Sequence, residues 1–233
     1  MSLSVVLSEA YNFFRNHLSQ LAAFTFPLLL AQVGIQLWLG SEFKVMDESN
    51  PQFGGAHFFA MMMLLVIFSM LIASLTLFLQ VRSEGNNLSA GALLKASLPF
   101  VPPLLLAGVF SGMAVIAPVM IAAALGPLWI IGLVLSLYIF SRLAYVNFMV
   151  VAERLTPLEA IKASFQFSSP IVLHTIGLLL LYVPLMLIGG AVGTLLSGAG
   201  MPVQLVIESL FAFIGLFVNV ALFRLYMVTR AKA

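Results

Sequence analysis

The chain has 233 residues, of which 62% are hydrophobic and only 8% are charged, and its formal net charge is +2. A soluble globular protein of this length needs far more polar residues to cover its surface, so the composition excludes a water-soluble fold and indicates a protein solvated by lipid. Cysteine is absent, which excludes disulfides, thiolate nucleophiles and thiolate metal ligands.

Six apolar segments are each long enough to cross the hydrocarbon core of a membrane, which requires about 20 helical residues. They predict an all-α, polytopic bundle with transmembrane helices at 18–40, 57–81, 100–124, 128–151, 171–194 and 203–228. Prolines lie inside the first, third and fifth spans, at Pro27, Pro118 and Pro184. Because proline breaks the helical hydrogen-bond pattern, we expect a kink in these three spans and straight helices in the other three.

A short amphipathic helix is predicted before each odd-numbered span, at 8–18, 88–99 and 155–167. The third is the clearest, because Thr156 and Glu159 have the spacing of a capping box around Pro157. Its apolar side chains, Leu158, Ile161 and Phe165, share one face at helical spacing, and its polar side chains share the opposite face. We expect each such helix to lie flat in the interface, with its apolar face in the acyl boundary.

The second and third amphipathic segments repeat the same pattern at an offset of 67 residues, which superimposes Lys95 on Lys162 and Pro103 on Pro170. A fainter first copy places Arg15 at the equivalent position. The repeats predict three parallel hairpins, each preceded by a flat basic helix, in units of about 1–82, 83–153 and 154–233. Together they form a single integral membrane domain, 1–233.

Basic residues predict the orientation, because Lys and Arg in short loops are retained on the cytoplasmic side. With six spans, one side receives Arg15, Arg82, Lys95, Arg154, Lys162, Arg224, Arg230 and Lys232, and the other side receives Lys44. Both termini are therefore predicted to be cytoplasmic. The basic residues are spread over several loops and form no stripe that could follow a nucleic acid, so nucleic-acid binding is excluded.

Three segments carry a resemblance to a known family: residues 12–16 (NFFRN), 160–165 (AIKASF) and 223–227 (FRLYM). Together they resemble the YciC family of bacterial multipass inner-membrane proteins. The resemblance implies a multi-pass location in the bacterial inner (cytoplasmic) membrane. It implies no catalytic residue.

Arg142 is the most informative single residue, because an arginine within a span is costly unless it reaches headgroups or faces a polar interior. Two interpretations stay open. The side chain extends toward inner-leaflet phosphates, or it shares a polar pocket with Asn219 and His174. Tyr138 and Tyr145 lie on its helix face in either case.

Other residues have simpler interpretations. Glu208 lies about six residues into the sixth span, where it indicates either a hydrated outer vestibule or a proton-coupling site. Glycines four residues apart, Gly189 with Gly193 and Gly108 with Gly112, predict close helix packing. The three histidines are scattered without metal-ligand spacing, and no phosphate-binding loop is present, so no metal and no cofactor are predicted.

The sequence favours a non-enzymatic membrane protein that interacts with lipids or organises the envelope, with anionic membrane lipids as partners. Candidate lipid- or ligand-binding residues are Arg142, Tyr138, Tyr145, Asn219, His174, Arg15, Lys95 and Lys162. The alternative is a transporter or flippase for a lipid or small amphipathic solute, using Arg142, Asn219, Tyr138 and Glu208. A lipid-modifying enzyme is a third class, and no catalytic acid, base or nucleophile pair supports it.

Overall fold

The computed structural model describes residues 2–46, 52–126, 129–196, 198 and 200–231 of the chain. These residues form α-helices and two short 3-10 turns, and they contain no strand. The helices are α1 (Leu3–Asn16), α2 (Leu18–Val45), α3 (Gly55–Ser83), α4 (Ala90–Ser97), α5 (Val101–Ala124), α6 (Trp129–Leu143), α7 (Val146–Ala152), α8 (Pro157–Ser168), α9 (Val172–Leu179), α10 (Tyr182–Leu195) and α11 (Met201–Arg230).

Within the described residues, six helical stretches are long and apolar enough to cross a membrane. Their positions match the six predicted spans: α2, α3, α5, α6 with α7, α9 with α10, and α11. The prediction of an all-α, multi-pass membrane protein is therefore confirmed at the level of helix length and composition.

One of the three spans that contain a proline is interrupted. α2 and α5 continue through Pro27 and Pro118, whereas the fifth span is interrupted between α9 and α10. This interruption begins at Leu180, four residues before Pro184. Pro184 has no N–H to donate to the Leu180 carbonyl, and its ring crowds that carbonyl.

The fourth span was predicted to be straight and is instead broken between α6 and α7. No proline lies there. The carbonyl of Arg142 accepts hydrogen bonds from the Ser164 and Ser168 hydroxyls of α8, at 2.7 and 3.2 Å. Side chains that insert into the backbone hydrogen-bond ladder are a known cause of helix breaks, and they account for this one.

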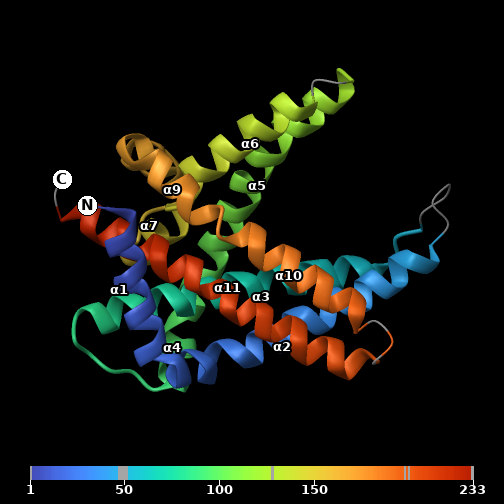
Figure 1. Ribbon diagram of the computed structural model, residues 1–233, viewed down its shortest axis with the longest axis horizontal. Coiled ribbons are helices and arrows are strands. Elements are labelled where there is room, and N and C mark those ends of the chain that lie inside the picture. Colours follow the sequence, from blue (N-terminus) through green and yellow to red (C-terminus); the bar gives the residue numbers. More distant parts are fainter. Residues whose placement is uncertain (1, 47–51, 127–128, 197, 199, 232–233) are drawn as a thin grey trace.

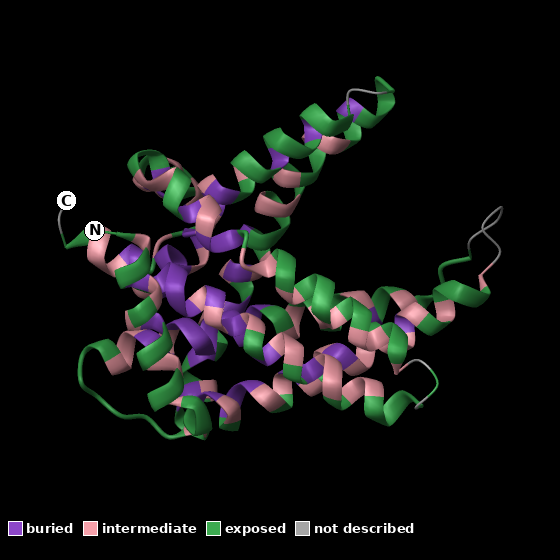
Figure 2. Ribbon diagram, in the orientation of Figure 1, coloured by how far each residue is buried: buried purple, intermediate pink, exposed green. Residues whose placement is uncertain are grey.

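The long helices pair as hairpins, α2 with α3, α5 with α6, and α10 with α11. Figure 1 shows that these hairpins meet near α1 and α7, where both chain ends lie, and that α5 and α6 then diverge from the other four helices. We call the shared end of the molecule the base. Figure 2 shows the buried residues concentrated at the base, while the far ends of the hairpins are largely exposed.

The three predicted amphipathic helices form as α1, α4 and α8. The capping box of α8 is present: the backbone N–H of Thr156 donates to Oε2 of Glu159 at 3.1 Å. Ser89 caps α4 by accepting from the N–H of Ala92 at 3.3 Å.

The buried face of α8 differs from the predicted apolar face. Ala160, Ser164 and Ser168 are buried against the protein, whereas the side chain of Leu158 is 65% exposed. Small side chains let α8 approach the ends of α5 and α6 closely, so the larger apolar side chains lie at its flanks. The positions 67 residues earlier, Leu93, Ser97 and Val101, are also buried. The same helix face is thus buried in both segments, although repetition of whole hairpins stays a prediction.

Candidate functional site

Arg142 lies in the last turn of α6, and its side chain extends toward α8. The guanidinium donates to the carbonyl of Phe165 and to the hydroxyl of Tyr138, the latter at 3.1 Å. It also lies over both aromatic rings, 5.6 Å from the Tyr138 centroid and 5.4 Å from that of Phe165. Arg142 therefore fastens the α5–α6 hairpin to α8.

Among the described residues, the side-chain partners of Arg142 are Tyr138 and Phe165 and include neither Asn219 nor His174. His174 is exposed on α9, whereas Asn219 is partly buried and donates to the Tyr182 hydroxyl in the wall of the groove described below. Tyr145 is buried, and its hydroxyl lies 2.6 Å from that of Thr175. The predicted pocket rested on equal depth along different spans, and depth alone does not say which hairpins are neighbours. The α5–α6 hairpin diverges from α11, so equal depth does not produce contact.

The other predicted lipid-binding residues, Arg15, Lys95 and Lys162, are exposed on three separate helices, α1, α4 and α8. None lines either of the two cavities described below. Each could meet headgroups from its own helix. Lys232 lies outside the described residues.

A groove of about 800 Å³ lies between the first and third hairpins and is lined by α2, α3, α10 and α11. It exists because α10 packs mainly on α11, while α2 packs on both α3 and α11, which leaves space between α3 and α10. Met186 on α10 and Phe68 on α3 line this space and are 74% and 47% exposed. The groove therefore opens sideways, toward the lipid that surrounds a membrane-spanning bundle.

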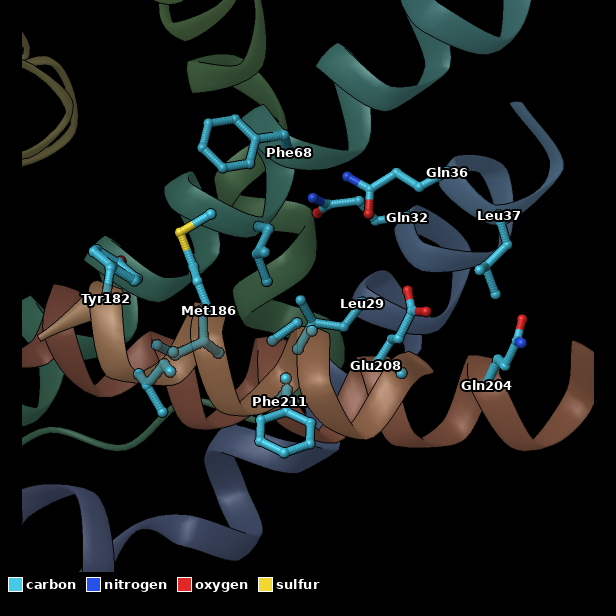
Figure 3. A pocket seen from close by; sticks show the side chains of 18 of the residues that line it. Leu29, Gln32, Gln36, Leu37, Phe68, Tyr182, Met186, Gln204, Glu208 and Phe211 are labelled. Atoms are coloured by element: carbon cyan, nitrogen blue, oxygen red, sulfur yellow. The ribbon is translucent and has the colours of Figure 1, made fainter. Parts of the chain in front are cut away.

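The groove has a polar side, formed by residues at helical spacing on two helices. Gln32 and Gln36 lie one turn apart on α2, and Glu208 and Asn219 lie three turns apart on α11. Figure 3 shows Gln32, Gln36 and Glu208 directed into the same space. Tyr182 adds a hydroxyl, which accepts a hydrogen bond from Nδ2 of Asn219 at 2.9 Å.

Two groups on the polar side have unsatisfied interactions. The Oε1 atom of Gln32 is buried and has no hydrogen-bond partner among the described residues, and such an atom costs about 1–3 kcal/mol when it stays unpaired. Glu208 forms no ion pair with any residue that the structure describes. A ligand that supplies hydrogen-bond donors would satisfy both.

The rest of the wall is apolar. Its large side chains are Leu29, Leu37, Phe68, Leu71, Ile72, Leu185, Met186, Phe211 and Leu216. An apolar wall facing a strip of amides, a phenol and a carboxylate is the pattern of a small-molecule site, and 800 Å³ falls within the usual range for such sites.

The glycines of α10 have a role other than the predicted one. A Cβ atom added at Gly190 or Gly193 would meet no atom within 4 Å, and both residues line the groove. Gly108 and Gly112 of α5 are equally free of neighbours. The prediction of close helix packing at these positions is therefore wrong, except at Gly189, where the Cβ would lie 3.5 Å from the Phe211 ring.

Sequence reasoning missed Gln32, Gln36 and Tyr182. A signal was available, because two glutamines one turn apart are rare within an apolar span and mark a single polar face. Glu208, for which the sequence left a hydrated vestibule or a proton-coupling site open, lines the groove. Its partners could not be inferred, since they depend on which hairpins are adjacent.

Comparison of the chain with protein-family models, with curated proteins and with solved structures finds no match.

Proposed function

We propose that this protein is a non-enzymatic, multi-pass protein of the bacterial inner membrane that binds an amphipathic lipid in the groove between its first and third hairpins. The observation that carries the proposal is the sideways opening of the groove between Phe68 and Met186, beside a polar strip within the membrane-spanning helices. A lipid could enter from the bilayer without leaving it. Its chain would lie along the apolar wall while its headgroup meets the strip.

The charges of the groove favour a zwitterionic headgroup. Among the described residues that line the groove, two are charged: Glu208 on α11 is acidic and Lys44 on α2 is basic. The remaining polar groups are neutral amides and hydroxyls. A headgroup that carries an amine can pair with Glu208, and a purely anionic one would be repelled by it. The side chain of Gln32 would then accept from the amine.

Location and orientation are part of the proposal. The resemblance of residues 12–16, 160–165 and 223–227 to the YciC family supports an inner-membrane location. The basic residues gathered at the base support cytoplasmic termini, with Lys44 alone at the far end of α2. Because the chain has no native cysteine, single cysteines at Ser41 and Asn86 can be labelled with an impermeant reagent. We expect labelling of intact spheroplasts at Ser41→Cys only; labelling at Asn86→Cys instead would reverse the orientation.

The assignment to a non-enzymatic class rests on the composition of the groove. Glu208 is the one acidic residue that lines it, and no histidine of the described chain does. Among the described residues, no three His, Asp or Glu side chains are placed to hold a metal ion. A hydrolytic or transfer reaction on a lipid requires a positioned acid, base or nucleophile pair, or a metal ion, and the groove supplies one carboxylate.

The test is the lipid that stays bound after gentle purification, measured by native mass spectrometry for the wild type and two matched variants. Gly193→Leu adds a side chain at the groove wall, and Gly112→Leu adds the same side chain on α5, outside the groove; neither new Cβ meets an atom within 4 Å. We expect Gly193→Leu to lose a defined lipid that the wild type and Gly112→Leu retain. The same lipid content in all three would refute the groove as a binding site.

One observation favours transport as a second candidate function. A separate cavity of about 410 Å³ lies nearer the base and is lined by the same helices α3 and α11. On α3 the two cavities are separated at Leu75, which is buried between Ile72 of the groove and Leu79 of the second cavity. On α3 the barrier therefore spans about two helical turns. Dithionite quenching of fluorescent lipid in reconstituted vesicles would detect transfer between leaflets, and its absence would leave binding alone.

A further inference from the structure

We propose that the second cavity, at the base of the molecule, is an anion site that holds the phosphate of an anionic phospholipid. It is lined by residues of α1, α3 and α11, three helices that come together at the base in Figure 1. It is distinct from the groove, and the inference does not depend on the groove binding any ligand.

Arg82 is the central residue of this cavity. Its guanidinium donates to Oε1 of Gln20 and lies 5.8 Å from the centre of the Phe78 ring, so the side chain is held in one position by a neutral partner and an aromatic one. It forms no ion pair with any residue that the structure describes. Its Nε atom is buried without a hydrogen-bond partner in the described part of the chain. Among the described residues, the guanidinium charge of Arg82 therefore has no ionic partner and its Nε–H donor has no acceptor.

The other charges of the cavity cancel. Arg224 on α11 also lines it, and its Nε atom lies 2.6 Å from Oε2 of Glu9 on α1. The Arg82 charge therefore sets the balance of the walls, which is positive. An unpaired charge that is partly removed from water is costly, so an anionic ligand is the partner that this arrangement lacks.

Two neutral hydrogen-bond donors line the same cavity as Arg82. Asn12 and Asn16 of α1 lie four residues apart and both line the cavity, so their amides occupy the same helix face. A guanidinium with nearby amide donors suits the several acceptor oxygens of a phosphate, because hydrogen bonds between a cation and an anion are about twice as strong as neutral ones.

The remaining wall favours a lipid over a free phosphate. Phe13, Leu79, Phe223 and Met227 line the same cavity, so the donors are bordered by apolar side chains. A phosphate that carries an acyl chain can bury apolar surface against these residues, and inorganic phosphate cannot. An anionic lipid is favoured over a zwitterionic one, since an amine would bring a second positive charge close to Arg82.

The experiment titrates detergent-purified protein with dioctanoyl phosphatidylglycerol, dioctanoyl phosphatidylcholine or inorganic phosphate, and follows binding by native mass spectrometry. The variants are Arg82→Gln and Arg15→Gln, which remove the same charge from the cavity wall and from an exposed position on α1. Asn16→Asp is a second cavity variant that introduces a negative charge and leaves Arg82 in place, should Arg82→Gln fail to fold.

We expect phosphatidylglycerol to bind the wild type and Arg15→Gln equally, and to bind Arg82→Gln and Asn16→Asp about tenfold more weakly or worse. If inorganic phosphate binds as well as the lipid and also depends on Arg82, the anion site is supported and its ligand is a soluble phosphate. Equal phosphatidylglycerol binding by Arg82→Gln, Arg15→Gln and the wild type would overturn the proposal. Loss of the groove lipid in Gly193→Leu is measured separately, so failure of either site is recognised independently.

Discussion

The hairpins α5–α6 and α10–α11 use glycine for opposite purposes. In α5–α6, a Cβ atom added at Gly132 would lie 2.6 Å from both the Pro118 carbonyl oxygen and the Ala122 Cβ, so the two helices touch there. In α10–α11, Gly190 and Gly193 have no neighbour within 4 Å of the same position, and they line the groove. A small residue in a membrane helix therefore marks either a contact or a space, and only the packing of the neighbouring helix tells which.

The largest expected effect comes from filling the contact. Gly132→Leu forces the α5 and α6 backbones apart at Pro118, and we expect a cost of about 3 kcal/mol or more, with loss of monodisperse protein on size-exclusion chromatography. Gly193→Leu is the matched control, because it adds the same side chain where there is space. Monodisperse, thermally stable Gly132→Leu protein would contradict the close approach of the two helices.

The next effect concerns how the α5–α6 hairpin, which we call the closed hairpin, is attached to the rest of the molecule. Arg142→Leu removes the hydrogen bonds to Phe165 and Tyr138 and both ring contacts, and we expect a loss of about 2 kcal/mol, seen as a lower melting temperature in detergent. Retention of the groove lipid should not change, because no residue of α6 lines the groove. A variant with normal stability but no bound lipid would restore the ligand pocket predicted for Arg142.

A smaller effect is expected within the α10–α11 hairpin, which we call the open hairpin. Tyr182→Phe leaves the ring in place and removes the hydroxyl that accepts from Asn219, which should cost about 1 kcal/mol. A double-mutant cycle with Asn219→Leu checks the pairing: in that background Tyr182→Phe should cost almost nothing. Equal costs in both backgrounds would show that the hydroxyl acts through another partner.

The fold could be predicted from the sequence largely because helix length, apolar composition and capping are local properties. The six spans and the Thr156–Glu159 capping box follow from short stretches of residues, and the structure has them. The break after Arg142 could not be predicted, because it is caused by serines of α8 more than twenty residues later in the chain. Contacts between segments that are distant in the sequence cannot be predicted from a short stretch of residues.

The candidate site could be predicted less well, for the same reason. Glu208 and Asn219 were recognised as polar residues within a span, but their neighbours Gln32 and Tyr182 lie on helices far away in the sequence. Arg15, Lys95 and Lys162 are conspicuous on amphipathic helices and remain exposed, whereas Arg82, at the end of an ordinary span, lines a cavity.

The smallest expected effect tests whether hydrogen bonding, in addition to close packing, holds the closed hairpin together. Ser136 of α6 is buried, and its hydroxyl donates to the carbonyl of Val115 on α5 at 2.6 Å, close to the site where Pro118 lacks an N–H. Ser136→Ala removes this bond and keeps the small volume that lets the helices approach. Hydrogen bonds between membrane helices contribute about 0.6 kcal/mol on average, so we expect a melting temperature only slightly below that of the wild type. Ser136→Val keeps no hydroxyl and adds volume, and it should be clearly less stable than Ser136→Ala if packing dominates. If the two variants are equally destabilised, the hydrogen bond matters more than the packing, and the difference between the closed and open hairpins lies in their polar contacts.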